Sequence, residues 1–209
     1  FLALMRMHKA EVVAGLVKRL AQEQTIEKKK GILSTLCRLH SKEGEWKRDS
    51  WGTRPDNRGP YYQPEPWEQT STIASVLQSH LSHASREEAA HLVAEMNRNR
   101  IQSQEALTRI IELAKSDVSL IPEAVTQLAS SETPPVDGIP LLIHAAKDSN
   151  SKPTTLSQTV QAIVKTDNTE AWKQVLPAMV SLSQAKGSGK EQDAAQSALM
   201  GAPKLENVH

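Results

Sequence analysis

The chain has 209 residues, of which 38% are hydrophobic; its mean hydropathy is -0.46, and no apolar run approaches the roughly 20 residues that cross a bilayer, so we expect no membrane span. Its 25 Lys and Arg are balanced by 24 Asp and Glu, which argues against a nucleic-acid-binding protein, because binding to phosphate backbones needs an excess of basic residues. A single cysteine excludes an internal disulfide and any CxxC zinc site or CxxCH haem-attachment site within these residues.

The residues available for a core are almost entirely aliphatic. Phe, Trp and Tyr together number seven, and no segment shows the alternating pattern of a half-buried strand. We therefore expect an all-α chain. The first apolar stripes have helical spacing and predict an N-terminal helix pair within residues 1–43. Their members are Val12, Val13, Leu16, Val17 and Leu20, followed by Ile32, Leu33, Leu36, Cys37 and His40.

Short amphipathic helices also fill the chain after Trp67, and several carry start or stop signals. Ser85 and Glu88 have the spacing of a capping box. Pro122 and Pro140 suit the first turn of a helix, where the missing N–H costs nothing. Pro177 lies inside an apolar pattern, so we expect it to kink or split that helix.

Pairing these short helices gives a repeat of roughly 30 to 40 residues, near the period of HEAT and armadillo arrays. A helical hairpin that is apolar on one face buries that face by stacking on its neighbours. We therefore predict an α-solenoid of HEAT-like hairpins over residues 67–203. An irregular helical bundle stays open as the alternative, because periodicity alone does not separate the two. Since the sequence starts at Phe1, we read it as a piece of a longer protein, in which residues 204–209 begin the connection to a downstream domain.

An aromatic and proline-rich loop over residues 44–66 interrupts the helices. Its turn chemistry predicts a loop, and its aromatic content predicts that the loop is ordered. In one reading the rings are a plug packed between helices; in the other they form an exposed platform that binds ligands. We favour the plug, because ordering the loop requires burying several rings. The candidate ligand-binding or plug residues are Trp51, Arg54, Asp56, Arg58, Tyr61, Tyr62 and Trp67.

The segment GILSTLCRLHSKEGEWKRDSWGTRPDNRGPYYQPEPWEQT resembles part of the large PVC-type haem-binding CxxCH proteins, also called membrane-bound dehydrogenase domain proteins. The motif W-x-T-R-P-D-x-x-G-P-Y-Y begins here at Trp51. The stretches 97–100 and 205–209 are also similar to that family. The resemblance implies a HEAT-like helical segment between a β-propeller, similar to sugar dehydrogenases, and a cytochrome c domain. It implies no catalytic role for the motif, and we assign no catalytic residue.

The same resemblance sets expectations for cofactor and location. Cys37 is alone and is followed by Arg38 and Leu39, so this chain holds no covalent haem; the resemblance implies that haem c is attached beyond His209. It also implies a periplasmic or other extracytoplasmic location, where covalent haem is attached. The parent protein would be a haem-linked dehydrogenase, whereas we expect no enzyme activity in this chain.

Two smaller candidates have ordinary explanations. His80 and His83 lie one helical turn apart and would seed a metal site, but solvated or capping histidines are the default, so we predict no metal. Cys37 lies on an apolar stripe, which indicates a buried, inert thiol rather than a nucleophile.

Three functions were compared on these grounds. The first is a non-catalytic scaffold or interaction module, whose partners are neighbouring domains of the same parent chain or other proteins. The alternative is a carbohydrate-binding or catalytic module using the Trp51–Trp67 loop. A nucleic-acid-binding helical array is the third, and it is disfavoured because Lys and Arg are interleaved with Glu and Asp throughout the chain.

Overall fold

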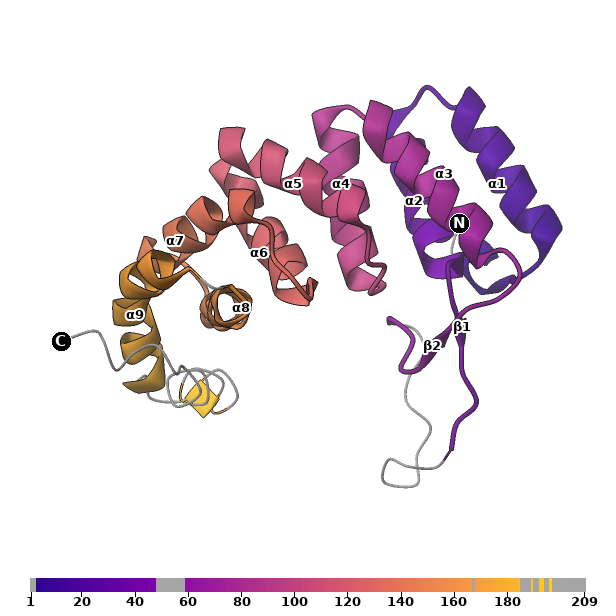
Figure 1. The fold of residues 1–209 in the computed structure, drawn as a ribbon. Helices are drawn as coiled ribbons and strands as arrows, with labels where there is room; N and C mark the ends of the chain where they lie inside the picture. The colour runs from indigo at the N-terminus through magenta and orange to yellow at the C-terminus, as the bar shows by residue number, and fades with distance from the viewer. Residues whose placement is uncertain are drawn as a thin grey trace. The chain divides into compact units, whose positions relative to one another are not determined.

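The computed structural model describes residues 3–47, 59–166 and 168–184, together with positions 189, 192, 193 and 196. This part of the chain is mostly α-helical, which confirms the predicted all-α class (Figure 1). The chain divides into two compact units, residues 1–109 and 110–209. Four of the seven loop candidates lie outside the described residues, as reported below.

Unit 1 is organised around its second helix. Its elements are η1 (Leu4–Arg6), α1 (Ala10–Gln22), α2 (Ile26–Leu39), β1 (Lys42–Glu43), β2 (Pro64–Glu65), α3 (Thr70–His83) and α4 (Arg86–Arg98). Helix α2 packs against η1, α1, α3 and α4, and α3 also packs against α4. Because α2 is enclosed in this way, Ile32, Leu33, Leu36 and Leu39 have no exposed surface. The next helix, α5 (Gln104–Ser116), contains the boundary between the two units.

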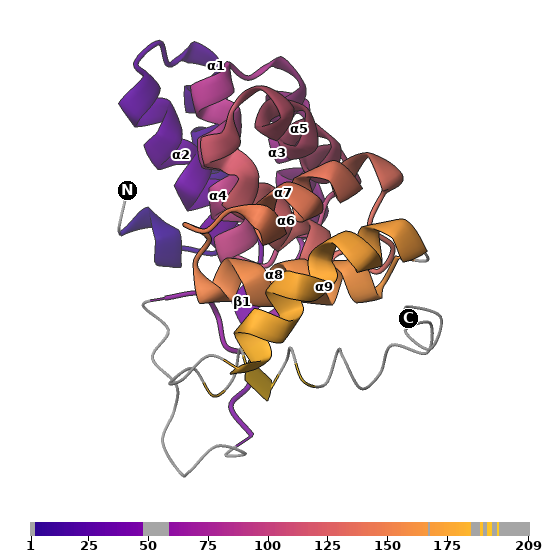
Figure 2. The ribbon, with the colours of Figure 1, turned by 90° about the vertical axis from the view of Figure 1, so that its left-hand side faces the viewer.

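In the described part of unit 2, each helix after α5 packs on the next helix but one as well as on a sequence neighbour. The elements are η2 (Val118–Leu120), α6 (Ile121–Ser130), η3 (Val136–Gly138), α7 (Ile139–Lys147), α8 (Pro153–Val164) and α9 (Thr169–Gln184). Helix α6 packs on α7 and α8, α7 on α8 and α9, and α8 on α9 (Figure 2). Leu128, Leu142, Ile163, Val175 and Met179 are fully buried in this unit.

The helix-start signals act as predicted. The Ser85 hydroxyl accepts from the Glu88 N–H, and the Glu88 carboxylate accepts from the Ser85 N–H, which completes the capping box of α4. Prolines occupy the first turns of α6, α7 and α8. Asn168 caps α9 through its side-chain oxygen, which accepts from the Ala171 N–H at 2.9 Å.

Pro177 does not split its helix, so that part of the prediction is wrong. Helix α9 continues from Thr169 to Gln184 with Pro177 inside it. Proline removes one hydrogen bond, but buried residues lie on both sides of it. Trp172 and Val175 precede the proline, and Met179 and Leu182 follow it. Their packing holds both halves of the helix in place.

A two-residue antiparallel ladder was not foreseen from the sequence. Lys42 pairs with Glu65, and Glu43 pairs with Pro64. The ladder joins the two ends of the aromatic segment where it leaves α2 and returns to α3 (Figure 1). It is too short to show an alternating apolar pattern, which explains why sequence periodicity did not reveal it. No helix in the described residues is long and apolar enough to cross a membrane.

Candidate functional site

Three of the seven predicted loop residues lie in the described part of unit 1. Tyr61 is buried, Tyr62 is 46% exposed, and Trp67 is partly buried. The other four, Trp51, Arg54, Asp56 and Arg58, lie outside the described residues. The arrangement of the site is therefore built from the two ends of the aromatic segment and from the helices that they contact.

The base of the segment is closed by backbone pairing and by one carboxylate. The Gly44 N–H donates to the Gln63 carbonyl at 2.7 Å. The Glu43 carboxylate accepts from the N–H groups of Tyr62 and Gln63, at 3.1 and 2.8 Å. A Cβ at Gly44 would lie 2.9 Å from the Gln63 carbonyl oxygen and 2.6 Å from a Glu65 carboxylate oxygen. Only glycine therefore allows the two chains to approach this closely.

Trp67 fastens the segment to the C-terminal end of α2. Its indole Nε1–H donates to the Leu39 carbonyl at 2.7 Å. Thr70 Oγ1 accepts from the Trp67 N–H at 2.8 Å and donates to the His40 carbonyl at 2.7 Å. The last carbonyls of a helix have no partner within the helix. Trp67 and Thr70 supply two of these missing donors.

Two further side chains contact the Trp67 ring. Lys42 Nζ lies 4.8 Å from the centroid of the Trp67 ring, and the His8 ring lies edge-on with its centroid at 5.2 Å. The His8 ring also hydrogen-bonds the Ser41 carbonyl through Nε2 at 2.9 Å. Burial lowers the pKa of His8, and the nearby Lys42 and Arg38 lower it further, against the hydrogen bond with Ser41. His8 therefore favours its neutral form.

Tyr61 packs on the side of α2. The Arg38 guanidinium lies over its ring, 3.4 Å from the centroid, an arrangement that adds cation–π attraction to simple burial. Burial raises the pKa of the Tyr61 hydroxyl, Glu43 contributes in the same direction, and Arg38 opposes the rise. Of the three candidate rings that are described, Tyr61 and Trp67 thus act as anchors, and Tyr62 is exposed.

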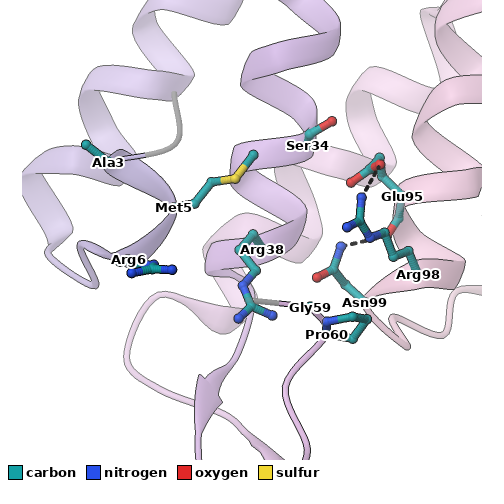
Figure 3. A pocket seen from close by; sticks show the side chains of 10 residues that line it. All are labelled: Ala3, Met5, Arg6, Ser34, Arg38, Gly59, Pro60, Glu95, Arg98 and Asn99. Atoms are coloured by element: carbon teal, nitrogen blue, oxygen red, sulfur yellow. Dashed lines mark hydrogen bonds and ion pairs between the residues drawn. The ribbon is translucent and has the colours of Figure 1, made fainter. Parts of the chain in front are cut away.

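A pocket of about 500 Å³ lies beside this anchor (Figure 3). It is bordered by η1, α2, α4 and the returning end of the aromatic segment. Among the described residues, its lining is Ala3, Met5, Arg6, Ser34, Arg38, Gly59, Pro60, Glu95, Arg98 and Asn99. The volume falls within the range of small-molecule sites.

The electrostatics of the pocket are dominated by guanidinium groups. Burial lowers the pKa of Arg38; Tyr61 and Glu43 oppose this, and the positive charges of Arg6 and Arg98 add to it. The guanidinium groups of Arg6 and Arg98 therefore each lie close enough to Arg38 for their charges to act on it. Arg98 lies 3.7 Å from the Glu95 carboxylate. The Asn99 amide nitrogen donates to the Glu95 carbonyl at 2.9 Å.

The backbone beside the pocket is in an uncommon conformation. Arg100 has φ 58, the left-handed region in which a non-glycine residue is uncommon. The conformation ends α4, where the Ile101 N–H donates back to the Met96 carbonyl at 2.9 Å. The Arg100 side chain reaches the Tyr62 carbonyl at 3.5 Å. The end of α4 is thus connected to the aromatic segment.

Sequence reasoning did not select Arg6, Arg38 or Arg98 as site residues. Arg98 lies in the stretch 97–100 that resembles the haem-protein family, and this was the one available signal. Arg6 and Arg38 come from η1 and α2, 32 positions apart in the printed numbering. Their approach depends on the packing of η1 against α2, which no local pattern encodes.

His80, one of the two histidines considered for a metal, lies beside a partly buried ion pair. The Glu88 carboxylate is 3.0 Å from Lys29 Nζ and 3.9 Å from His80 Nε2. His83 faces elsewhere and hydrogen-bonds the Ser79 carbonyl at 3.0 Å. Burial lowers the pKa of His80, and Glu88 opposes this. Over the described ranges, no three His, Cys, Asp or Glu side chains gather as a metal site.

Cys37 is 1% exposed on the inner face of α2. Burial raises the pKa of its thiol well above the ordinary value, and the charge of Glu95 adds to the rise. A reactive cysteine needs a thiolate and access to solvent. The prediction that Cys37 is buried is confirmed, and its lack of reactivity stays a prediction.

No match was found in a scan against protein-family models, in a search of curated proteins or in a search of solved structures.

Proposed function

We propose that this chain is a non-catalytic helical scaffold within a larger redox protein. The observation that carries the proposal is the use made of the aromatic segment. Tyr61 and Trp67, two of the four rings considered for stacking on a ligand, instead hold the segment against α2. Aromatic residues that hold a loop against its own helix make a module rigid, and a rigid module is suited to positioning other domains.

The same proposal includes a HEAT-like or armadillo-like stacking of the helices. Its support is the packing inside each unit, where α2 contacts α4, α6 contacts α8, and α7 contacts α9. Contacts between alternate helices are typical of stacked hairpins. Small-angle X-ray scattering tests this, because a compact chain of this length has a radius of gyration of about 17 Å. A value well above that supports the solenoid; a value near it indicates a bundle.

The identity of the attached domains rests on the resemblance of residues 31–70 to PVC-type haem-binding proteins. We propose a sugar-dehydrogenase-like propeller before this chain and a cytochrome c domain after it, in an extracytoplasmic protein. The coding sequence on either side is the first test. Propeller repeats upstream and a CxxCH motif downstream support the placement, and flanks without either one refute it.

A second test addresses the scaffold itself in the parent protein. Replacing Tyr61 by Leu and Trp67 by Phe should loosen the segment from α2. We expect slower reduction of the haem by substrate, with KM and the haem spectrum unchanged, because only domain positioning is disturbed. A raised KM would show instead that the aromatic segment binds substrate, as the carbohydrate-binding alternative requires. An unchanged rate would contradict a positioning role.

A further inference from the structure

The pocket in unit 1 carries an excess of positive charge. Its described lining contains three guanidinium groups, from Arg6, Arg38 and Arg98, and one carboxylate, from Glu95. Glu95 lies beside Arg98, so its charge is directed to one side of the pocket. Arg6 makes no side-chain hydrogen bond or ion pair with any described residue, and it is available to a ligand.

The three guanidinium groups that line the pocket come from separate elements. Arg6 lies at the end of η1, Arg38 in the last turn of α2, and Arg98 in the last turn of α4 (Figure 3). Each comes from a helical element that packing holds in place, and α2 contacts both of the others. The positive charges of Arg6 and Arg98 both act on Arg38, and an anion bound beside these groups would offset that unfavourable interaction.

The rest of the lining suits a small organic molecule rather than a bare ion. Met5, Ala3 and Pro60 provide apolar surface, while Ser34 and Asn99 provide polar atoms. The Ser34 hydroxyl is 3.0 Å from His91 Nε2, and Asn99 uses its amide nitrogen on α4, which leaves its side-chain oxygen to accept from a hydroxyl group. A guanidinium binds carboxylate and phosphate groups through paired hydrogen bonds.

We propose that this pocket binds a small hydroxylated molecule that carries a carboxylate or phosphate group. Arg6, Arg38 and Arg98 contact the oxyanion, and Asn99 accepts from a hydroxyl group of the ligand. This site differs from the loop residues considered for stacking on sugars. It is also independent of the scaffold proposal, because a scaffold needs no ligand.

Isothermal titration calorimetry of the full chain tests the proposal with galacturonate, galactose and inorganic phosphate as probes. We expect galacturonate to bind and neutral galactose to bind at least about tenfold more weakly, because charge-assisted hydrogen bonds to arginine are lost. Binding of phosphate alone would assign the site to phosphorylated ligands. Equal binding of galactose and galacturonate would overturn the proposal, as would the absence of any binding up to about 10 mM of the two anions.

Variants distinguish the pocket from general attraction to a charged protein. Arg6→Gln combined with Arg98→Gln should weaken anion binding about tenfold or more. The matched control is Lys18→Gln combined with Lys28→Gln, which removes the same charge from exposed positions on α1 and α2. Equal loss in both pairs would overturn the proposal. Arg6→Gln alone provides the same comparison if the double variant is unstable, with Lys18→Gln as its control.

Discussion

Tyr61 and Tyr62 are neighbours in sequence with opposite surroundings. Tyr61 is 9% exposed with Arg38 over its ring, whereas Tyr62 is 46% exposed. We expect Tyr61→Leu to lower the free energy of unfolding by about 2 kcal/mol, through lost packing and lost cation–π contact. Tyr62→Leu should change it by less than about 0.5 kcal/mol. Urea denaturation measures both, and equal effects would show that Tyr61 is not an anchor.

At the residue scale, the sequence indicated which side chains matter but not what they contact. The concentration of rings in residues 44–66 predicted an ordered segment, and the anchoring of Tyr61 agrees with the plug reading for that residue. The partners could not be predicted. The Leu39 carbonyl accepts the hydrogen bond of the Trp67 indole, although the two residues are 28 positions apart in the sequence. This carbonyl is free to accept only because α2 ends at Leu39, so that it has no partner within the helix.

The capping box is the element-scale feature that the sequence revealed most directly. Ser85→Ala removes the hydroxyl that accepts from the Glu88 N–H and donates to the Glu88 carboxylate. We expect a loss of about 1 kcal/mol, because an unsatisfied N–H remains at the start of α4. Ser82→Ala is the control, since that exposed hydroxyl bonds only within α3. Similar midpoints in urea for the two variants would contradict a stabilising cap.

We expect substitution by alanine to change the free energy of unfolding in opposite directions at two glycines. Gly138 lies against Leu128, and a Cβ there would overlap the buried end of that side chain. We expect Gly138→Ala to destabilise the chain by about 1–3 kcal/mol through overpacking. Gly15 lies within α1 with no atom near its Cβ position, so Gly15→Ala should stabilise by about 0.5–1 kcal/mol. Thermal melting of both variants tests the pair, and a shift of the same sign would refute the assignment.

The helices could be predicted because their sequence signals are local. The features that were not predicted depend on contacts between residues far apart in the sequence. Apolar spacing and caps lie within a few residues of each other, as in α4 and α9. Continuity through Pro177 depends on packing of Trp172 and Met179 against other helices. The β1–β2 ladder joins residues on opposite sides of a long segment. Neither effect has a short-range signature.

At the scale of the whole molecule, unit 1 should lose stability as the pH falls below neutral. Burial lowers the pKa of His8, His40 and His80 in the folded state. The unfolded chain therefore takes up protons first, near pH 6.5, which favours unfolding as the pH falls through that value. Urea denaturation at pH 7.5, 6.5 and 5.5 should show a falling midpoint.

A substitution assigns this loss to a particular group. His40→Asn should reduce the fall in stability between neutral and mildly acidic pH, because the amide does not titrate. His83→Asn serves as the control, since His83 is exposed on α3. A pH dependence that is identical in the wild type and in both variants would contradict the assignment to partly buried His40.

A second acid transition should follow at lower pH. The hydrogen bond from the Thr25 N–H lowers the pKa of Glu23 to about 2, with a further contribution from Arg19. Burial of the carboxylate opposes this shift but does not cancel it. The contribution of Glu23 is present above the ordinary value of 4.5 and is lost as the pH falls from there toward 2. Glu23→Gln should flatten the stability profile in this range. Glu27→Gln, at an exposed position, should leave it unchanged.

The single cysteine makes the opening of unit 1 measurable without any labelling site being added. Cys37 lies on α2 and is buried between this helix and its neighbours. A thiol reagent therefore reacts with it only when unit 1 opens transiently and α2 separates from the helices around it. The rate of thiol modification in native buffer therefore measures how often unit 1 opens. Because the chain has no second thiol, unit 2 contributes nothing to the signal, and the opening of unit 1 is measured separately from that of unit 2.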